Sequence, residues 1–342
     1  MSFISRIKSI YPVPWRSFRQ FEDEVFRRLD HLEQTAGGND PKTEMRFWAL
    51  FQREGEDLQA AKERFFAAIP PATGTMRLLQ DAQAKLLHEM HQLCTDNDIQ
   101  YWATGGTLIG ARRHRGFIPW DDDLDVAIMR DDLEKLRRIV ETDQRYRVEI
   151  LWDYRTACEQ IRFRPANPRN PAFVDLFIFD WTNEPSVKMY QRSQKYRQTK
   201  IVDVVRDRFA VSRWPSQWLL EDSDPFAAKV REVFSQAREA EMKESYVTDR
   251  EHATGIYRSI ENFDDPTGFP YVGTLDDWFP AAEMEFEGSP IWVPRNSQKY
   301  LDGPYGDIWE LPNDMGLHFE HVSHEDLENE EVLEILREYI SE

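Results

Sequence analysis

Hydrophobic residues recur at helical spacing over most of the first hundred positions. Apolar side chains fall every three or four residues in two segments, residues 17–34 and 43–69, and Pro70-Pro71 ends the second one. A third, strongly amphipathic helix is expected over residues 75–99. The pattern therefore predicts a helical N-terminal extension, residues 1–74, ahead of the domain that contains the third helix.

Beyond residue 100 the apolar runs become short, which is typical of strands. A three-residue run at 101–103 and an alternating run at 124–129 are the first two, and a helix capped by Asp131 or Asp132 is expected to follow. Later strands are predicted at residues 147–151, 160–163 and 173–180, before a charged helical insertion at 182–250. These elements predict an α+β fold, a mixed sheet flanked by helices, for residues 75–342.

The alternating run carries acids where it enters the predicted sheet. Asp123 and Asp125 are separated by the apolar Leu124, so in a strand they project to one face, about 7 Å apart. Such a pair suits a hard cation such as Mg²⁺, which binds one or two carboxylates together with substrate phosphates. A calcium loop is excluded, because its sixth position is Val126 instead of Gly and its twelfth is Asp132 instead of Glu. An acidic surface turn is the simpler alternative, and the interleaved apolar residues argue against it.

Two glycines precede the acidic run, at the start of a helix expected near Thr107. Gly105 and Gly106 allow the backbone to approach a ligand closely, and the N–H groups of a helix N-terminus bind phosphate. A basic turn follows, Arg112-Arg113-His114-Arg115, and this cluster is a candidate to hold the pyrophosphate of a nucleotide. The alternative for the basic turn is pairing with Asp121 or Asp122.

A third acid lies in a later strand. Asp175 interrupts the otherwise apolar run of residues 173–180, and a carboxylate is costly to bury unless it is paired or binds a metal. We therefore expect Asp175 to be paired or to bind a metal.

Residues 105–125, with the sequence GGTLIGARRHRGFIPWDDDLD, resemble the signature of the LicD family. Members of that family are phosphocholine-transferase-like proteins with a nucleotidyltransferase fold, and the animal fukutin-related proteins are distant relatives. Segments between Phe279 and Pro312 follow the family order again, whereas residues 1–74 lie outside the resemblance.

The resemblance implies a nucleotidyltransferase-like fold with a metal-dependent site. It implies Mg²⁺, or Mn²⁺, bound by three catalytic acids, Asp123, Asp125 and Asp175. The residues expected to contact the nucleotide are Gly105, Gly106, Thr107, Arg113, His114 and Asp121. The implied reaction transfers a phospho-alcohol, phosphocholine first, from a CDP-alcohol donor to a hydroxyl of a cell-surface glycan acceptor, with release of CMP. A true nucleotidyltransferase and a catalytically silent scaffold remain as alternatives.

Composition limits the partners further. Sixty-two acidic against 43 basic residues give a net charge of −19, which makes general nucleic-acid binding a poor hypothesis. Two cysteines support neither a disulfide framework nor a zinc cluster, and no apolar run approaches a membrane span, so we predict a cytoplasmic protein.

The basic and apolar residues 1–20 are a candidate for peripheral contact with the inner face of the membrane, and the favoured alternative is a fraying terminus or an arm docked on its own protein. The helix at 17–34 is expected to pack on its own domain, with a homo-oligomer interface as the alternative. Three histidines, His318, His321 and His324, recur every three residues, and a structural or phosphate-contacting role is expected for His318 or His321.

Overall fold

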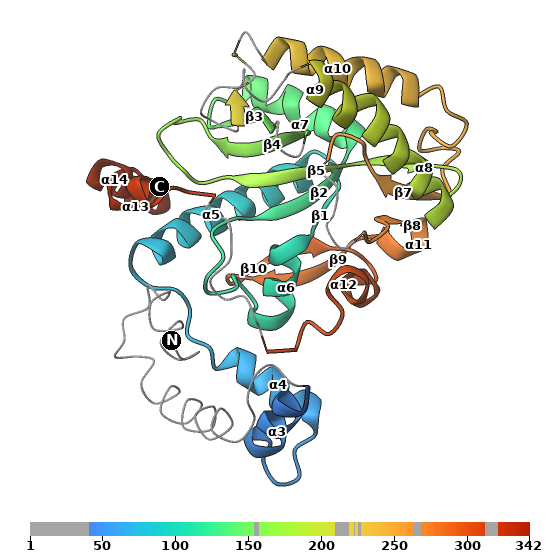
Figure 1. Ribbon diagram of the computed structural model, residues 1–342. Coiled ribbons are helices and arrows are strands. Elements are labelled where there is room, and N and C mark those ends of the chain that lie inside the picture. Colours follow the sequence, from blue (N-terminus) through green and yellow to red (C-terminus); the bar gives the residue numbers. More distant parts are fainter. Residues whose placement is uncertain are drawn as a thin grey trace.

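A mixed sheet with the strand order β1-β2-β5-β4-β3-β6 forms the centre of the computed structural model (Figure 1). The structure describes residues 41–153, 157–208, 219–221, 223–224, 227–262, 268–311 and 321–342. The strands are β1 (Tyr101–Ala103), β2 (Asp125–Met129), β3 (Tyr146–Asp153), β4 (Cys158–Pro165), β5 (Val174–Thr182), β6 (Leu219–Glu221), β7 (Gly255–Arg258) and β8 (Val272–Thr274). A separate hairpin consists of β9 (Ala282–Phe286) and β10 (Ser289–Val293).

Two neighbouring strands of this sheet, β2 and β5, run parallel, and their other sheet partners are antiparallel. Strand β5 is long enough to pair with β4 along its first half and with β7 along its second half. Leu124, Val126 and Ile128 are fully buried, as expected for a central strand with both faces covered. The predicted α+β fold with a mixed sheet is confirmed.

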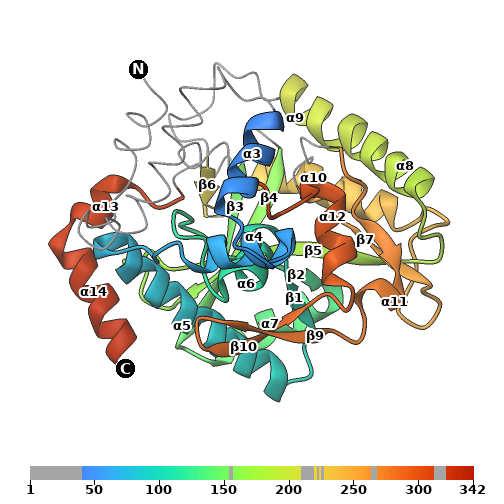
Figure 2. The ribbon, with the colours of Figure 1, turned by 90° about the horizontal axis from the view of Figure 1, so that it is seen from below.

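Helices cover both faces of the sheet. They are α3 (Pro41–Phe51), α4 (Leu58–Ala67), α5 (Gly74–Asp96), α6 (Gly105–His114), α7 (Arg130–Thr142), α8 (Val187–Arg197), the π-helix η1 (Gln198–Val202), α9 (Asp203–Arg208), α10 (Ala227–Glu241), α11 (Leu275–Trp278), α12 (Ser297–Tyr305), α13 (His324–Glu328) and α14 (Glu330–Ser341). In Figure 1, α7, α9 and α10 lie above the sheet, and α5, α6 and the β9–β10 hairpin lie below it. Seen from below, α4 lies over α6, against which it packs (Figure 2).

Three local expectations differ from the structure. The helix expected over 43–69 is two helices, α3 and α4, because the chain turns at Gly55 with a φ of +78°, a conformation that favours glycine. Helix α7 begins directly after β2 at Arg130, so Asp131 and Asp132 lie in its first turn instead of capping it. Strand β2 begins at Asp125, so Asp123 precedes the strand instead of lying within it.

The charged segment at 182–250 contributes apolar residues of its own to the interior. Ile201, Val205, Val230 and Phe234 form a second apolar cluster with Trp152 of β3. This cluster fixes α9 and α10 against the outer strands of the sheet. The division of the chain into residues 1–74 and 75–342 stays a prediction.

Two expectations concern the first 40 residues, which lie outside the described residues. They are the helix at 17–34 and the membrane contact of residues 1–20. Within the described ranges, every helix is too short or too polar to cross a membrane.

Candidate active site

Asp125 and Asp175 face each other at the start of the two parallel strands. They are register partners in the β2–β5 pair, and Asp175 donates its backbone N–H to Leu124 O at 2.7 Å. Asp123 lies just before β2, and ligand oxygens of Asp123, Asp125 and Asp175 all lie within 4.8 Å of one another. The structure therefore brings together the three acids that the sequence grouped.

The glycine turn packs directly against these carboxylates. Gly105 has a φ of +53°, and a Cβ placed on it would overlap Asp125 Oδ2, while a Cβ on Gly106 would overlap Asp121 Oδ2. Thr107 is turned toward the same strand, since its Oγ1 accepts the backbone N–H of Asp125 at 2.7 Å. Glycine is thus required at residues 105 and 106 for the close approach of α6 to the acids.

Two side chains of helix α5 donate hydrogen bonds to the backbone of the acidic loop. Gln80 Nε2 donates to Asp121 O at 2.9 Å, and Gln83 Nε2 donates to Asp122 O at 2.8 Å. Both glutamines are buried. Sequence reasoning missed them, although two polar residues three positions apart on an otherwise apolar helix face were a signal for such a role.

His321, from the C-terminal segment, is bound to the second acid of the run. Asp122 accepts three hydrogen bonds, from the backbone N–H groups of His321 and Val322 at 2.7 and 3.1 Å and from His321 Nδ1 at 3.0 Å. His321 Nε2 lies 3.4 Å from Asp123 Oδ2. Burial lowers the pKa of His321, but Asp122 and Asp123 outweigh it and raise this pKa to about 9. His321 is therefore a positively charged anchor; His318 lies outside the described residues.

The described residues balance only part of the negative charge of the cluster. Burial raises the pKa of Asp125 well above its ordinary value, and the charges of Asp123 and Asp175 raise it further. Burial likewise raises the pKa of Asp121 and of Asp123, again with neighbouring carboxylates adding to the effect.

Partial compensation comes from two buried arginines. Arg162 Nε donates to Asp175 Oδ1 at 2.9 Å, and Arg258 lowers the pKa of Asp125. Converging buried carboxylates with this shortage of positive charge fit a hard divalent cation, which prefers oxygen ligands. Asp123, Asp125 and Asp175 are the residues placed to bind it.

Arg113 and His114 are not brought to the carboxylates. They lie at the last turn of α6, about 12 Å along the helix from Gly105 at 1.5 Å per residue. Arg113 Nη1 donates to Ile308 O at 2.9 Å, and its guanidinium lies 4.4 Å from the ring centre of Phe66 in α4. Burial, with the charge of Arg113, lowers the pKa of His114 to about 3, so this imidazole is neutral.

The contact of Arg113 and His114 with a pyrophosphate stays a prediction. The alternative is that the basic turn pairs with Asp121 or Asp122; the hydrogen bonds that Asp122 accepts from the described residues come from the segment of His321 instead. Among the described residues, the cations nearest the acids are thus His321, Arg162 and Arg258, which come from three other segments of the chain.

Comparison with known proteins identifies the domain that contains this site. Residues 98–215 match the family described as LicD/FKTN/FKRP, nucleotidyltransferase domain. LicD of Haemophilus influenzae, a lipopolysaccharide cholinephosphotransferase, is 28% identical over 268 residues, which cover 70% of this chain and 92% of LicD. Residues 98–215 are thus similar to the nucleotidyltransferase domain of the LicD family. The human and mouse ribitol 5-phosphate transferase FKRP are each 48% identical to this chain over 42 residues, 11% of this chain and 8% of theirs.

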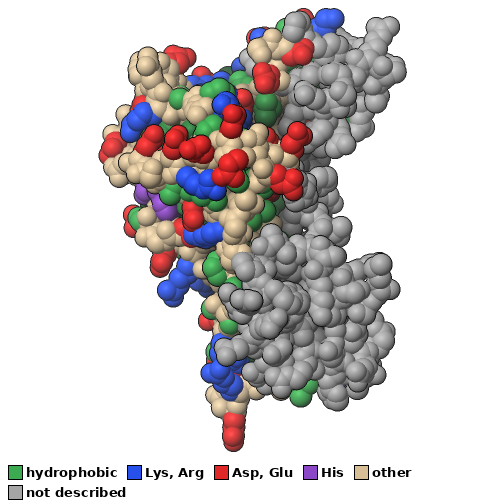
Figure 3. Space-filling view, turned by 90° about the vertical axis from the view of Figure 1, so that its left-hand side faces the viewer, with side chains coloured by type: hydrophobic (Ala, Val, Ile, Leu, Met, Phe, Trp, Pro, Cys, Tyr) green, Lys and Arg blue, Asp and Glu red, His purple; other side chains and the backbone are tan. Residues whose placement is uncertain are grey.

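The family match confirms the resemblance seen in residues 105–125, and the matched region contains all of the carboxylates discussed above. On the face in Figure 3, acidic side chains are interspersed with basic ones over the part that the structure describes.

Proposed function

We propose that this protein transfers a phospho-alcohol, with phosphocholine as the first choice, from a CDP-alcohol to a hydroxyl of a cell-surface glycan. The single observation that carries the proposal is the convergence of Asp123, Asp125 and Asp175 on one point beside the glycine turn. Similarity to a lipopolysaccharide cholinephosphotransferase along 92% of that protein supports the choice of group and acceptor.

In this reaction a bond forms between the acceptor oxygen and the phosphorus of the phospho-alcohol, and the bond from that phosphorus to CMP breaks. The three acids would hold Mg²⁺ or Mn²⁺, and the bound cation supplies charge neutralisation at the phosphates. The first turn of α6, at Gly105 and Gly106, offers backbone N–H groups to the donor phosphates. Asp175, oriented by Arg162, accepts the proton of the acceptor hydroxyl.

The test is release of nucleotide with Mg²⁺ from a panel of CDP-choline, CDP-ethanolamine, CDP-glycerol, CDP-ribitol, CTP and ATP. We expect slow release of CMP from one CDP-alcohol, abolished by chelation and accelerated by a glycan acceptor. Pyrophosphate release from CTP or ATP would replace the proposal with nucleotidyl transfer. Silence across the panel, with and without acceptor glycans, would favour a scaffold.

Two single substitutions test whether nucleotide release depends on the carboxylate site or on acidic residues in general. Asp125→Asn should abolish release while the protein stays folded. Asp276→Asn is the matched control, because the Asp276 side chain is 94% exposed and belongs to α11. Full cation-dependent release by Asp125→Asn would refute the assignment of the metal ligands.

A further inference from the structure

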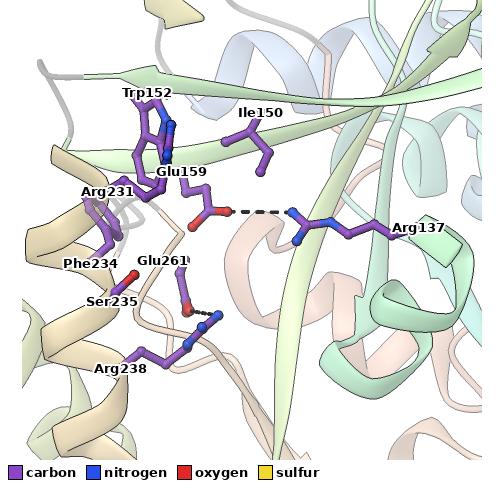
Figure 4. A pocket seen from close by; sticks show the side chains of 9 residues that line it. All are labelled: Arg137, Ile150, Trp152, Glu159, Arg231, Phe234, Ser235, Arg238 and Glu261. Carbon is purple, nitrogen blue, oxygen red and sulfur yellow. Dashed lines mark ion pairs between the residues drawn. The ribbon is translucent and has the colours of Figure 1, made fainter. Parts of the chain in front are cut away.

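A polar cavity lies between α7 and α10, away from the carboxylate cluster (Figure 4). Its volume is about 150 Å³, and β3 and β4 form its floor. Figure 4 shows Arg137 of α7 and Arg238 of α10 reaching into it from opposite walls. Arg231 adds a third guanidinium, and Glu159 and Glu261 are the acids of the lining.

This cavity is separate from the carboxylate cluster. Glu261 accepts a hydrogen bond from Arg130 Nη1 at 2.8 Å, and Arg130 follows the last residue of β2. Asp125 is the first residue of the same strand, so Arg130 lies about 16 Å from it at about 3.3 Å per residue. The two sites therefore occupy opposite ends of β2.

Arginines outnumber glutamates in the lining of the cavity, three to two. Glu261 accepts hydrogen bonds from Arg130 at both of its carboxylate oxygens, and Arg130 is also paired with Asp180 at 2.7 Å.

Arg137 donates from Nη1 to Glu134 of its own helix at 3.3 Å, but Arg137 and Arg238 are only loosely paired with the glutamates of the lining. Arg137 Nη2 lies 3.9 Å from Glu159 Oε1, and Arg238 Nη1 lies 4.0 Å from Glu261 Oε1, both beyond hydrogen-bonding distance. Arg137 Nη2 is buried and has no hydrogen-bond partner among the described residues. A buried donor in this state costs free energy unless a ligand accepts its hydrogen bond.

We propose that this cavity binds a phosphate group, either inorganic phosphate or the phosphate of a small monoester. The planar guanidinium matches phosphate oxygens in a bidentate fork, and Arg137 and Arg238 approach from opposite sides. A cavity of 150 Å³ admits a ligand about the size of benzene, and a phosphate is no larger. Trp152 and Phe234, whose ring centres lie 5.1 Å apart, line the cavity with apolar surface that suits the organic part of an ester.

The test is calorimetric titration of the full chain, without divalent cations, with inorganic phosphate in one arm and glycerol 1-phosphate in the other. We expect saturable binding in at least one arm, weakened about tenfold or more by Arg137→Gln and by Arg238→Gln. Arg138→Gln is the matched control, because Arg138 is the exposed neighbour on the same helix. Binding of phosphate alone or of the ester alone would identify the source.

Asp125→Asn should bind the anion as the unmodified chain does, so failure of this site and failure of the proposed transferase activity are distinguishable. Thermal unfolding without ligand shows whether each arginine variant is folded. No saturable heat in either arm up to about 10 mM, or equal weakening by Arg138→Gln, would overturn the proposal.

Discussion

Adding a methyl group at Gly105 should force the glycine turn and the Asp125 carboxylate apart. The change Gly105→Ala has two costs, because the φ of +53° is unfavourable for alanine and the new Cβ would overlap Asp125 Oδ2. The backbone cost is about 1–2 kcal/mol, reduced by about 0.4–1 kcal/mol through the stiffer unfolded chain. The Asp125 carboxylate can rotate away, but Asp125 Cβ, 3.3 Å from the added atom, is fixed by β2. Overpacking of this kind costs about 1–3 kcal/mol.

Gly74→Ala separates the two costs. Gly74 has a φ of +66°, and no atom lies within 4 Å of a Cβ placed there, so this variant has the backbone cost alone. In urea unfolding, Gly105→Ala should lose about 1–3 kcal/mol more than Gly74→Ala. It should also lose the rise in Tm on addition of Mg²⁺, which Gly74→Ala should retain. Equal losses of stability, with the Mg²⁺ response intact in both variants, would refute the reasoning.

Three further predictions concern stability. Burial raises the pKa of Glu241 to about 8. The contribution of Glu241 to the free energy of unfolding is therefore complete below about pH 4.5 and is lost as the pH rises toward 8. Glu241→Gln should be more stable than the unmodified chain at pH 8, and a pH profile of Tm that this substitution leaves unchanged would contradict the assignment. Phe66→Ala, at a fully buried position, should cost about 3–5 kcal/mol in urea unfolding; a loss below about 1 kcal/mol would mean that α4 does not pack on α6. His321→Phe removes the buried contact with Asp122 and should cost about 1.5–3 kcal/mol. His252→Phe, at an exposed pair, should change stability little, and equal losses for the two histidines would disprove the anchoring role.

Local patterns were enough to predict the elements that position the site. The apolar spacing of residues 75–99 predicted α5, whose Leu79, Leu86 and Met90 are fully buried. The resemblance to the LicD family, and not a local pattern, predicted which three carboxylates come together, and β2 and β5 do bring them to one edge of the sheet.

Local patterns could not predict the contacts between segments that are distant in the sequence. The partner of Asp122 lies 199 residues downstream, and no spacing rule connects the two positions. Arg113 was expected near phosphate because of its chemistry, but its direction depends on the turn of α6 on which it lies and on the packing of Phe66 against it. The split between α3 and α4 depends on one glycine conformation that a helical spacing pattern does not encode.

The contact between His321 and Asp122 also bears on how the protein is made. Chains fold from the N-terminus during synthesis, so the sheet and its carboxylates can assemble long before the C-terminal segment leaves the ribosome. Asp122 receives its three hydrogen bonds only after residue 322 has been translated and released. A prematurely terminated chain would therefore carry every acid of the cluster without the imidazolium that anchors the acidic loop, and such fragments should be unstable substrates for proteolysis instead of partly active enzymes.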